Sequence, residues 1–575
     1  MSIPARSQKT AALNKSEKIS SYDPAGLRTG VPILVGVTGH RDLRDQDVPK
    51  LRELVQAELQ SLCEKCPNSP IVMLNSLAQG ADQLCAGVAL ELGLPLKAVL
   101  PFDIEEYRKD FKDLALLEFD RLYAAAEEVF TAPETEAGPA GSRDFKYRQA
   151  GIYIASHSHV LLALWDGNPG RQGGCGTAET VGFILDLNYT GKNGSFFKAD
   201  SDGAVIQIIT PRQNGPEPEN ALTSCLIENV KGSLKTSLSA TDTFNKDAVT
   251  ADTRRSFPLI GSDTLASAGK NIICMHNIYK KADSLSVAFR DKYLSNLKLL
   301  SIFGICLVLA FLLYDELESN LFLPLYGVIL IISFAALRLA QKGSWHKKYL
   351  EYRALAETLR VQFYLSISGI CCNICDSFVW SQKNEIVWIK EASSALLVGP
   401  PPEVKAAPEK IKEAWIDRQL DYHVKKRRTI AASIRMNSGW TNALLAASVV
   451  LYAVVCLMEA LAPAAMSSVI PSGSFKNILY MHEGQQIVLR GAFKIILGVM
   501  SAIALFLSNY YGKLSLERKI SDNEKMAALY HAAQRKWDEP ETRRELIMVE
   551  LAREEVVENG FWLSYSRDNK PDISI

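Results

Sequence analysis

The chain has 575 residues, and its 64 Lys and Arg balance its 64 Asp and Glu, so the formal net charge is zero. A chain of this length exceeds what one hydrophobic core supports, and about three or four structural units are expected. Nucleic-acid binding calls for a basic arm, stripe or face, which the sequence lacks. The composition therefore argues against direct recognition of nucleic acid.

The cysteines indicate a reducing compartment. Eleven of them are scattered without the spacing of a disulfide framework, and residues 1–30 lack the apolar core of a signal peptide. We expect 1–30 to be a flexible segment and the soluble parts to lie in the cytosol. Two CxxC pairs, Cys63/Cys66 and Cys372/Cys375, stand far apart with no histidine cluster nearby. They are interpreted as apolar cysteines, and no metal site is expected.

Residues 31–215 alternate short apolar runs with amphipathic segments, as parallel strands with crossover helices do. This pattern predicts a Rossmann-like, doubly wound α/β domain, whose ligands lie beyond the carboxyl ends of the strands. A polar connector is expected over 216–269. The predicted strands span 31–37, 71–76, 94–100, 159–165 and 204–210.

The first predicted strand ends in the turn GVTGHRDL. Gly36 and Gly39 permit close backbone approach, while Thr38, His40 and Arg41 offer a hydroxyl, an imidazole and a fixed cation. A turn of this composition is a candidate contact for a phosphate or a sugar.

Two further strands end in candidate turns. In LAQGADQL, Gly80 precedes a helix whose first turn carries Asp82, which either caps the helix or accepts hydrogen bonds from ribose hydroxyls. The turn WDGNPGRQGGCGTAE leads into a helix expected to begin near Thr177, and a helix N-terminus is a natural anion site. Because the carboxyl ends of parallel strands share one edge, the three turns predict one nucleotide or phosphosugar site. The candidates in the third turn are Asp166, Gly173, Gly174, Gly176, Thr177 and Glu179.

This segment resembles the SLOG superfamily through six motifs in order: GVTGHRDL, SLAQGADQLCAGVALELG, VLPF, SHVLLALWDG, GGCGTAE and ITPR. That Rossmann-like group relates the cytokinin-activating LOG phosphoribohydrolases, the DNA-processing protein DprA and nucleotide-sensing domains of bacterial conflict systems. The resemblance implies that the residues of the three turns contact a nucleotide-derived ligand. No cofactor beyond that ligand is expected.

The third turn departs from the LOG enzymes, whose GGxGTxxE loop places the catalytic Glu three residues after Thr. That position is Thr180 here, and Glu179 comes one residue earlier. A shift of one position along a helix rotates the side chain by about 100° around the helix axis, which removes the carboxylate from a defined reaction geometry. Cys175 lies near the helix start, where a thiol pKa falls, but no neighbouring base marks it as a nucleophile. We expect a sensor with no catalytic residues; the alternative is a membrane-anchored nucleotide hydrolase or N-glycosidase.

The composition changes again near residue 299, where uncharged stretches begin. Four of them are long enough to cross a hydrocarbon core of about 30 Å, although buried helices of a large soluble protein remain the alternative interpretation. They form two modules of one plan, 270–392 and 413–575, joined by a Pro-rich linker over 393–412. The predicted spans are 298–316, 320–340, 439–460 and 492–512.

Lys and Arg flank the same end of every predicted span, which by the positive-inside rule places both termini and the α/β domain in the cytosol. Coupled transport is disfavoured because the uncharged stretches carry no ionisable groups. Three interpretations of the spans remain: a pore formed by oligomerisation, membrane disruption and a plain anchor.

The helical modules are similar to SLATT modules, two-span effectors that are often coupled to SLOG sensors, through YRALAETLRVQ and the plan of each repeat. Together the two resemblances imply an effector of bacterial anti-phage defence in the inner membrane. Its SLOG domain would sense a second messenger, such as a cyclic nucleotide or an ADP-ribose derivative. A homo-oligomer would then open or disrupt the bilayer. The second alternative is a metabolite-regulated ion channel.

Overall fold

The computed structural model describes residues 29–134, 142–169, 176–185, 199, 203–317, 320–400, 402, 405–466, 489–513, 516–539 and 543–568. The predicted N-terminal segment 1–30 therefore lies almost entirely outside the described residues. The chain forms two compact units, and each of them combines segments that are distant in the sequence. The α/β unit comprises Met1–Ser284, Ala354–Ala407 and Ala552–Phe561; the helical unit comprises Leu285–Arg353, Pro408–Leu551 and Trp562–Ile575.

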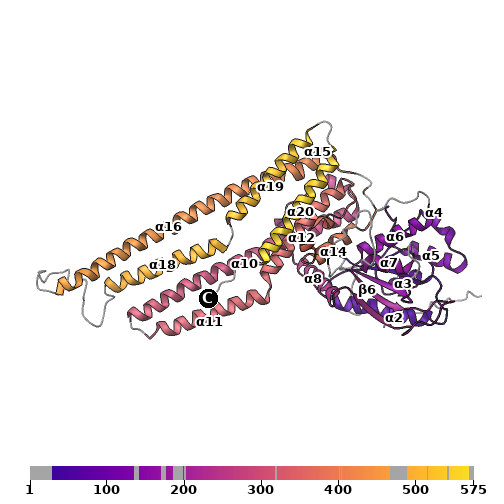
Figure 1. The fold of residues 1–575 in the computed structure, drawn as a ribbon, viewed down its shortest axis with the longest axis horizontal. Coiled ribbons are helices and arrows are strands. Elements are labelled where there is room, and N and C mark those ends of the chain that lie inside the picture. Colours follow the sequence, from indigo (N-terminus) through magenta and orange to yellow (C-terminus); the bar gives the residue numbers. More distant parts are fainter. Residues whose placement is uncertain are drawn as a thin grey trace, which may run out of the picture. The chain divides into compact units, whose positions relative to one another are not determined.

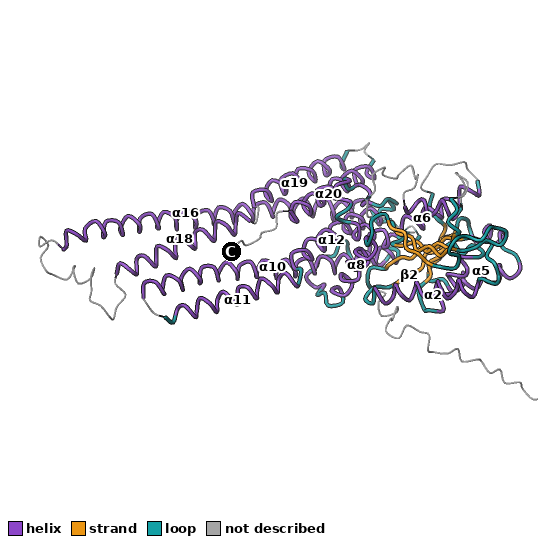
Figure 2. Tube along the Cα trace, turned by 60° about the horizontal axis from the view of Figure 1, so that its bottom comes forward, coloured by secondary structure: helices purple, strands orange, loops and turns teal. Residues whose placement is uncertain are grey.

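A sheet of seven strands lies at the centre of the α/β unit in the part of the chain that the structure describes (Figures 1 and 2). The strand order is β4-β3-β2-β1-β5-β6-β7, and all neighbours pair parallel except β6 and β7. The doubly wound α/β class and the five predicted strands are confirmed. The strands are β1 Ile33–Gly39, β2 Ile71–Asn75, β3 Leu96–Leu100, β4 Glu128–Thr131, β5 Val160–Trp165, β6 Ala204–Ile209 and β7 Ser224–Glu228.

Two strands were not predicted, and both lie at sheet edges. β4 has only four residues, while the residues of β7 are exposed or half-buried, so neither has the continuous apolar run of a central strand. β7 adds antiparallel to β6 and lies within residues 216–269, as does the helix α8, Ser233–Ala248. The sheet thus continues beyond the segment that the sequence predicts as the α/β domain.

Helices cover both faces of the sheet, which explains why its central strands are apolar throughout. Along β1, Ile33 and Val35 enter one core while Leu34 enters the other, as the alternation of a strand requires. The first core contains side chains from α2 Val48–Lys65, α3 Ala81–Glu91 and α5 Asp113–Ala125. The second contains side chains from α6 Arg143–His157, α7 Thr177–Leu185 and α14 Val387–Leu397.

The remaining helices are mostly long. α10, α11 and α12 belong to the first predicted module, and α16, α18, α19 and α20 belong to the second. The described part of the chain also contains short helices: α4 Ile104–Tyr107, α9 Ser262–Ala266, α13 Trp380–Lys383, α15 Pro408–Ile411, a π-helical turn at Lys412–Asp417 and 3₁₀ helices at Arg108–Asp110, Thr253–Arg255 and Ile374–Ser377. The long helices are α10 Lys270–Leu317, α11 Phe322–Lys342, α12 Trp345–Ile367, α16 Arg418–Met466, α18 Leu489–Lys513, α19 Leu516–Trp537 and α20 Arg544–Asp568.

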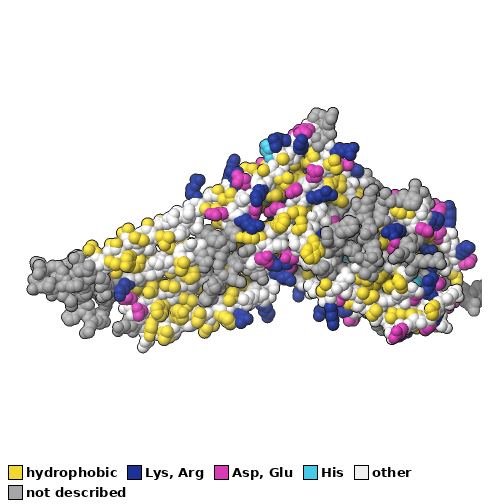
Figure 3. Space-filling model, in the orientation of Figure 1, with side chains coloured by type: hydrophobic (Ala, Val, Ile, Leu, Met, Phe, Trp, Pro, Cys, Tyr) yellow, Lys and Arg dark blue, Asp and Glu magenta, His cyan; other side chains and the backbone are white. Residues whose placement is uncertain are grey.

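Within the described residues, four helices are long and apolar enough to cross a membrane: Lys270–Glu316, Phe322–Ile367, Pro408–Leu457 and Gly491–Ser508. Their apolar side chains remain largely uncovered; Ile331 of α11 is 70% exposed and Val449 of α16 is 66% exposed. Figure 3 shows hydrophobic side chains gathered over these helices. The burial expected of helices in a soluble protein is thus missing, and the prediction of four membrane-spanning helices is supported by length, composition and exposure.

The two predicted modules pack against each other through α10 and α18, which run antiparallel. Gly304 of α10 lies against the ring of Phe506, and Gly498 of α18 lies against Leu312. Small residues let membrane helices approach closely. At the far end of the pair, Glu316 Oε1 lies 3.3 Å from Lys494 Nζ. This ion pair stands at the ends of two predicted spans, next to the uncharged stretches.

Packing at Gly39 generates a stability prediction. A Cβ atom there would collide with the Cβ of Ala81 and lie 3.0 Å from the carbonyl oxygen of Leu164. We expect Gly39→Ala to destabilise the protein by about 1–3 kcal/mol. Gly87→Ala on α3 is the matched control: its Cβ would meet no atom closer than 3.6 Å, and it should stabilise the helix by about 0.5–1 kcal/mol. Unfolding of the detergent-solubilised chain measures both, and equal effects would contradict the packing.

Candidate functional site

The sheet changes direction at β1. The chain adds β2, β3 and β4 on one side of β1 and then crosses to add β5 and β6 on the other side. In such sheets the loops leaving the two central strands diverge, and a crevice forms beyond their carboxyl ends. The first and third predicted turns follow β1 and β5, and the second follows β2. The structure therefore brings the first two turns and the described start of the third, at Asp166, to one edge.

His40 and Asp166 connect the two strands at this edge. The backbone N–H of Asp166 donates to Nε2 of His40 over 3.1 Å, and the carboxylate Oδ1 lies 3.3 Å from the same nitrogen. Burial lowers the pKa of His40 and outweighs the opposing charge of Asp166. The imidazole is therefore neutral at pH 7, with its proton on Nδ1, which leaves Nε2 free to accept.

The glycines of the first two turns are used in packing. Gly80 has φ +88°, and a Cβ there would lie 2.6 Å from the carbonyl oxygens of His40 and Arg41. The amide of Ala81 donates to the carbonyl of His40 over 3.0 Å. Gly36 lies against Ser158, at the end of α6, so the atoms that approach this glycine closely belong to the protein. These contacts hold the first two turns in one conformation.

Arg41 and Asp82 lie in a polar group beside this bridge. The exposed Arg41 has its guanidinium carbon 4.9 Å from the ring centroid of Tyr147. Asp82 is 5% exposed, and its Oδ2 accepts from Ser76 Oγ over 2.6 Å. Burial raises the pKa of Asp82 to about 6, against the lowering effects of Ser76 and of the charge of Arg41. Thr38 is also buried, on β1 opposite Ala163 of β5.

Tyr107 completes this group. Its side chain is fully buried, and its hydroxyl makes no well-formed hydrogen bond within the described residues, although Ser76 lies near it. Burial, with the charge of Asp82, raises the pKa of Tyr107 well above its ordinary value, so the hydroxyl keeps its proton. An unpaired buried hydroxyl costs about 1–3 kcal/mol.

The third turn contributes the N-terminus of α7. Gly176 precedes α7, and no atom of the described residues lies within 4 Å of where its Cβ would lie; Thr177 is the first helical residue. Glu179 in the first turn of α7 forms an ion pair with Arg148 of α6, whose guanidinium also lies over the ring of Phe183. The carboxylate of Glu179 is thus bound by the protein. Gly173, Gly174 and Cys175 lie outside the described residues.

The sequence did not point to Tyr107, Tyr147 or Arg148. Tyr107 lies in the short helix after β3, while Tyr147 and Arg148 lie on α6, which follows β4. The available signal was the run RDFKYRQ, in which cations and aromatic residues precede β5. Nothing in its spacing relates that run to the turn after β1.

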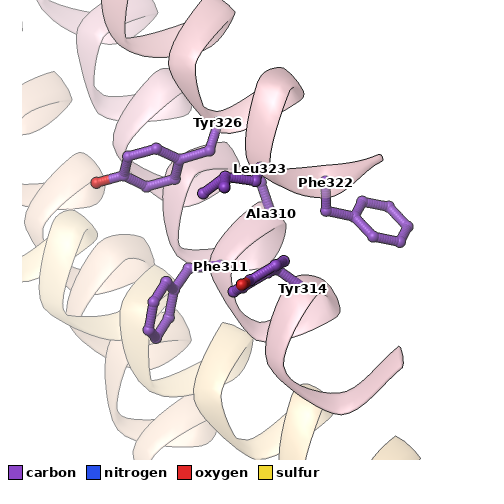
Figure 4. Close-up of a pocket in the computed structure, with 6 residues that line it drawn as sticks. All are labelled: Ala310, Phe311, Tyr314, Phe322, Leu323 and Tyr326. Atoms are coloured by element: carbon purple, nitrogen blue, oxygen red, sulfur yellow. The ribbon is translucent and has the colours of Figure 1, made fainter. Parts of the chain in front are cut away.

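Possible metal ligands and the cavity in the helical unit are separate from the site at the sheet edge. Within the described residues, no group of three or more His, Cys, Asp or Glu side chains could hold a metal ion. Burial raises the pKa of Cys63 and Cys66 to about 12, so these thiols remain protonated. A cavity of about 210 Å³ lies in the helical unit, where aromatic side chains of α10 and α11, such as Tyr314 and Tyr326, surround it (Figure 4).

The chain matches no family model and no curated protein. The fold and the site define the class of protein. It is an α/β protein with a polar site where the sheet changes direction, joined to four helices that can cross a membrane.

The raised pKa of Asp82 predicts a pH dependence of stability. Because the folded state holds the proton more tightly, the stabilising contribution of the protonated form is complete below about pH 4 and is lost as the pH rises through about 6. We expect Asp82→Asn to gain on the order of 2 kcal/mol relative to wild type between pH 4 and 7. Unfolding midpoints across this pH range measure the difference. The exposed Asp45→Asn is the control, and parallel pH profiles for the wild type and Asp82→Asn would contradict the prediction.

The pair of Arg148 and Glu179 predicts non-additive mutations. Arg148→Ala leaves a partly buried carboxylate without its cation, whereas the additional change Glu179→Gln removes that charge. The double variant should be more stable than the sum of the single effects by about 1 kcal/mol. A double-mutant cycle from denaturant unfolding measures this coupling, and a value near zero would show that the ion pair does not hold Glu179.

Proposed function

We propose that this chain is a ligand-gated membrane effector, in which the α/β unit senses a nucleotide-derived messenger and the helical unit permeabilises the bilayer. The SLOG and SLATT resemblances favour a role in bacterial anti-phage defence. They also favour a homo-oligomer in the inner membrane. Lys and Arg flanking the predicted spans favour cytosolic termini.

The polar edge of the sheet supports the sensing half of the proposal. Arg41 is an exposed, permanent cation suited to a phosphate, and its stacking on Tyr147 orients the guanidinium plane. The carboxylate of Asp166 is suited to ribose hydroxyls, as acidic side chains at this edge of Rossmann-like sheets often are. The N-terminus of α7, which begins at Thr177, is suited to a second anionic group.

Glu179 favours a sensor over the hydrolase alternative. A catalytic carboxylate must reach the reacting bond, whereas Glu179 is paired with Arg148. Glu179 also stands one residue before the position that the LOG motif uses. Its role in the proposal is to fix the start of α7 against α6.

The observation that carries the proposal is the continuity of three helices. α10 begins at Lys270 within the α/β unit and ends at Leu317 within the helical unit. α12 and α20 also cross from one unit to the other without a break. A helix that continues from a binding unit into a membrane unit can convert a change at the site into a movement of a span. Gating therefore requires that the ligand bind two states of the chain with different affinities.

Dye release from liposomes tests this function. Full-length protein in vesicles is exposed to a panel of cyclic di- and trinucleotides and ADP-ribose derivatives, and an active compound is then titrated. We expect Arg41→Ala to raise the half-maximal concentration at least about tenfold, because it removes the cation that binds phosphate. Arg52→Ala on α2, where Arg52 pairs with Glu91 over 2.6 Å, is the matched control and should leave release unchanged.

Two outcomes would contradict the proposal. Release that is the same with every compound, and the same in Arg41→Ala, would remove the sensing role. Turnover of a nucleotide to free base, lost in Glu179→Gln, would establish the hydrolase instead.

A further inference from the structure

The four predicted spans form a single row that is open at both sides. Figures 1 and 2 both show the order α16, α18, α10 and α11 in the helical unit. The inner helices α18 and α10 therefore have two neighbours each, whereas α16 and α11 have one. Burial follows this order: the apolar stretches of α10 and α18 are each 17% buried, and those of α11 and α16 are each 6% buried. Among the described residues, the outward sides of α11 and α16 have no partner.

The inner pair shows how the two modules pack. Gly304 of α10 lies against the ring of Phe506 of α18. Eight residues further along α10, and eight residues earlier on α18, Leu312 lies against Gly498. Each helix thus opposes a glycine to a large side chain of the other, so the two backbones approach closely. This contact joins the first span of one module to the second span of the other.

The outer helices hold the same two positions in their modules. α16 is the first span of its module and has 49 residues, against 48 in α10. α11 is a second span, as α18 is, and the helices that follow these two, α12 and α19, have 23 and 22 residues. The plan of the modules therefore allows a second contact between a first span and a second span. That contact requires another copy of the chain, because α16 and α11 lie at opposite sides of the row (Figures 1 and 2).

The outward faces match in depth. Ile331 of α11 is 70% exposed and stands 11 residues into the predicted span 320–340. Val449 of α16 is 66% exposed and stands 10 residues into the predicted span 439–460. Each is about 15–17 Å from the end of its span, which is the middle of a hydrocarbon core of about 30 Å. In two copies with one orientation in the bilayer, these two side chains lie at the same level.

The face of α16 is also shaped for a helix. Ala446 and Ala453 stand three residues before and four residues after Val449, so all three share one face, and all are exposed. Small residues beside a larger one let a neighbouring helix approach closely, as the glycines of the inner pair do. The bulkier Ile331 of α11 supplies the complementary side.

We propose that α16 of one copy packs antiparallel against α11 of a second copy, as α10 and α18 pack within one chain. Each copy then offers two different faces, so the contact is head to tail and repeats from copy to copy. Copies in one membrane join in this way into a closed ring. The inference rests on the proposed homo-oligomer in the membrane, and it names the surfaces that form that oligomer.

Cysteine cross-linking between two variants tests the contact. Full-length Ile331→Cys and full-length Val449→Cys are reconstituted together in liposomes without nucleotide and treated with a short, membrane-permeant bis-maleimide. Both chains also carry Cys456→Ser, which removes the exposed native thiol of α16. We expect the mixture to give at least about fivefold more cross-linked dimer than either variant alone, because the two cysteines meet only between copies.

Leu505→Cys is the matched control for Val449→Cys. Leu505 is 70% exposed, but it belongs to α18, which lies inside the row. Its mixture with Ile331→Cys should give no more dimer than the single variants. Three results would overturn the proposal. These are equal yields in the two mixtures, as expected if lipid covers α16; an equal yield from Ile331→Cys alone; and no yield above the single variants.

Native mass spectrometry of the wild type decides the question if a cysteine variant fails to fold. The ring predicts an oligomer in mild detergent, and the mass of a single chain would contradict it. The outcome is separable from the proposed function. Cross-linking without dye release by any nucleotide would retain the contact and remove the sensing role, whereas nucleotide-dependent release without cross-linking would do the reverse.

Discussion

The bridge between His40 and Asp166 is the contact on which the candidate site depends. It joins the ends of β1 and β5 where the sheet changes direction, and it requires a neutral imidazole that accepts the amide of Asp166. Burial supplies that condition by lowering the pKa of His40. With the strand ends joined, the packing of Gly80 on the carbonyl of His40 places the start of α3, and with it Asp82. These contacts set the positions of the first two turns relative to each other.

The candidate site at the sheet edge joins buried polar side chains to an exposed cation. The buried carboxyl of Asp82 accepts from Ser76, and the buried hydroxyl of Tyr107 lies near the same pair. Because buried polar groups in proteins are generally paired, the fold fixes the positions of these groups. The exposed Arg41, by contrast, is oriented by Tyr147 and remains open to solvent.

The fold was largely predictable, whereas the roles of the site residues were not. Central strands such as β1 and β5 are apolar along their whole length because both faces are covered, and that pattern is visible in the sequence. Gly39 and Gly80 lie at the same edge of the sheet, but the sequence could not reveal that Gly36 and Gly80 pack on protein atoms. Arg148, which holds Glu179, escaped prediction because the pair joins α6 to α7 with no regular spacing.

The sequence by itself determined the elements with a local signature: the buried strands, the turns that follow them, and the four long apolar helices. Only the tertiary structure decided which of these elements lie together. It adds α14 to the core beside β1, and it pairs Arg360 of α12 with Glu555 of α20 over 2.9 Å within the α/β unit. The physical reason is that strand order and ion pairs depend on contacts between residues distant in the chain. Hydrophobic period and turn chemistry, in contrast, are properties of neighbouring residues.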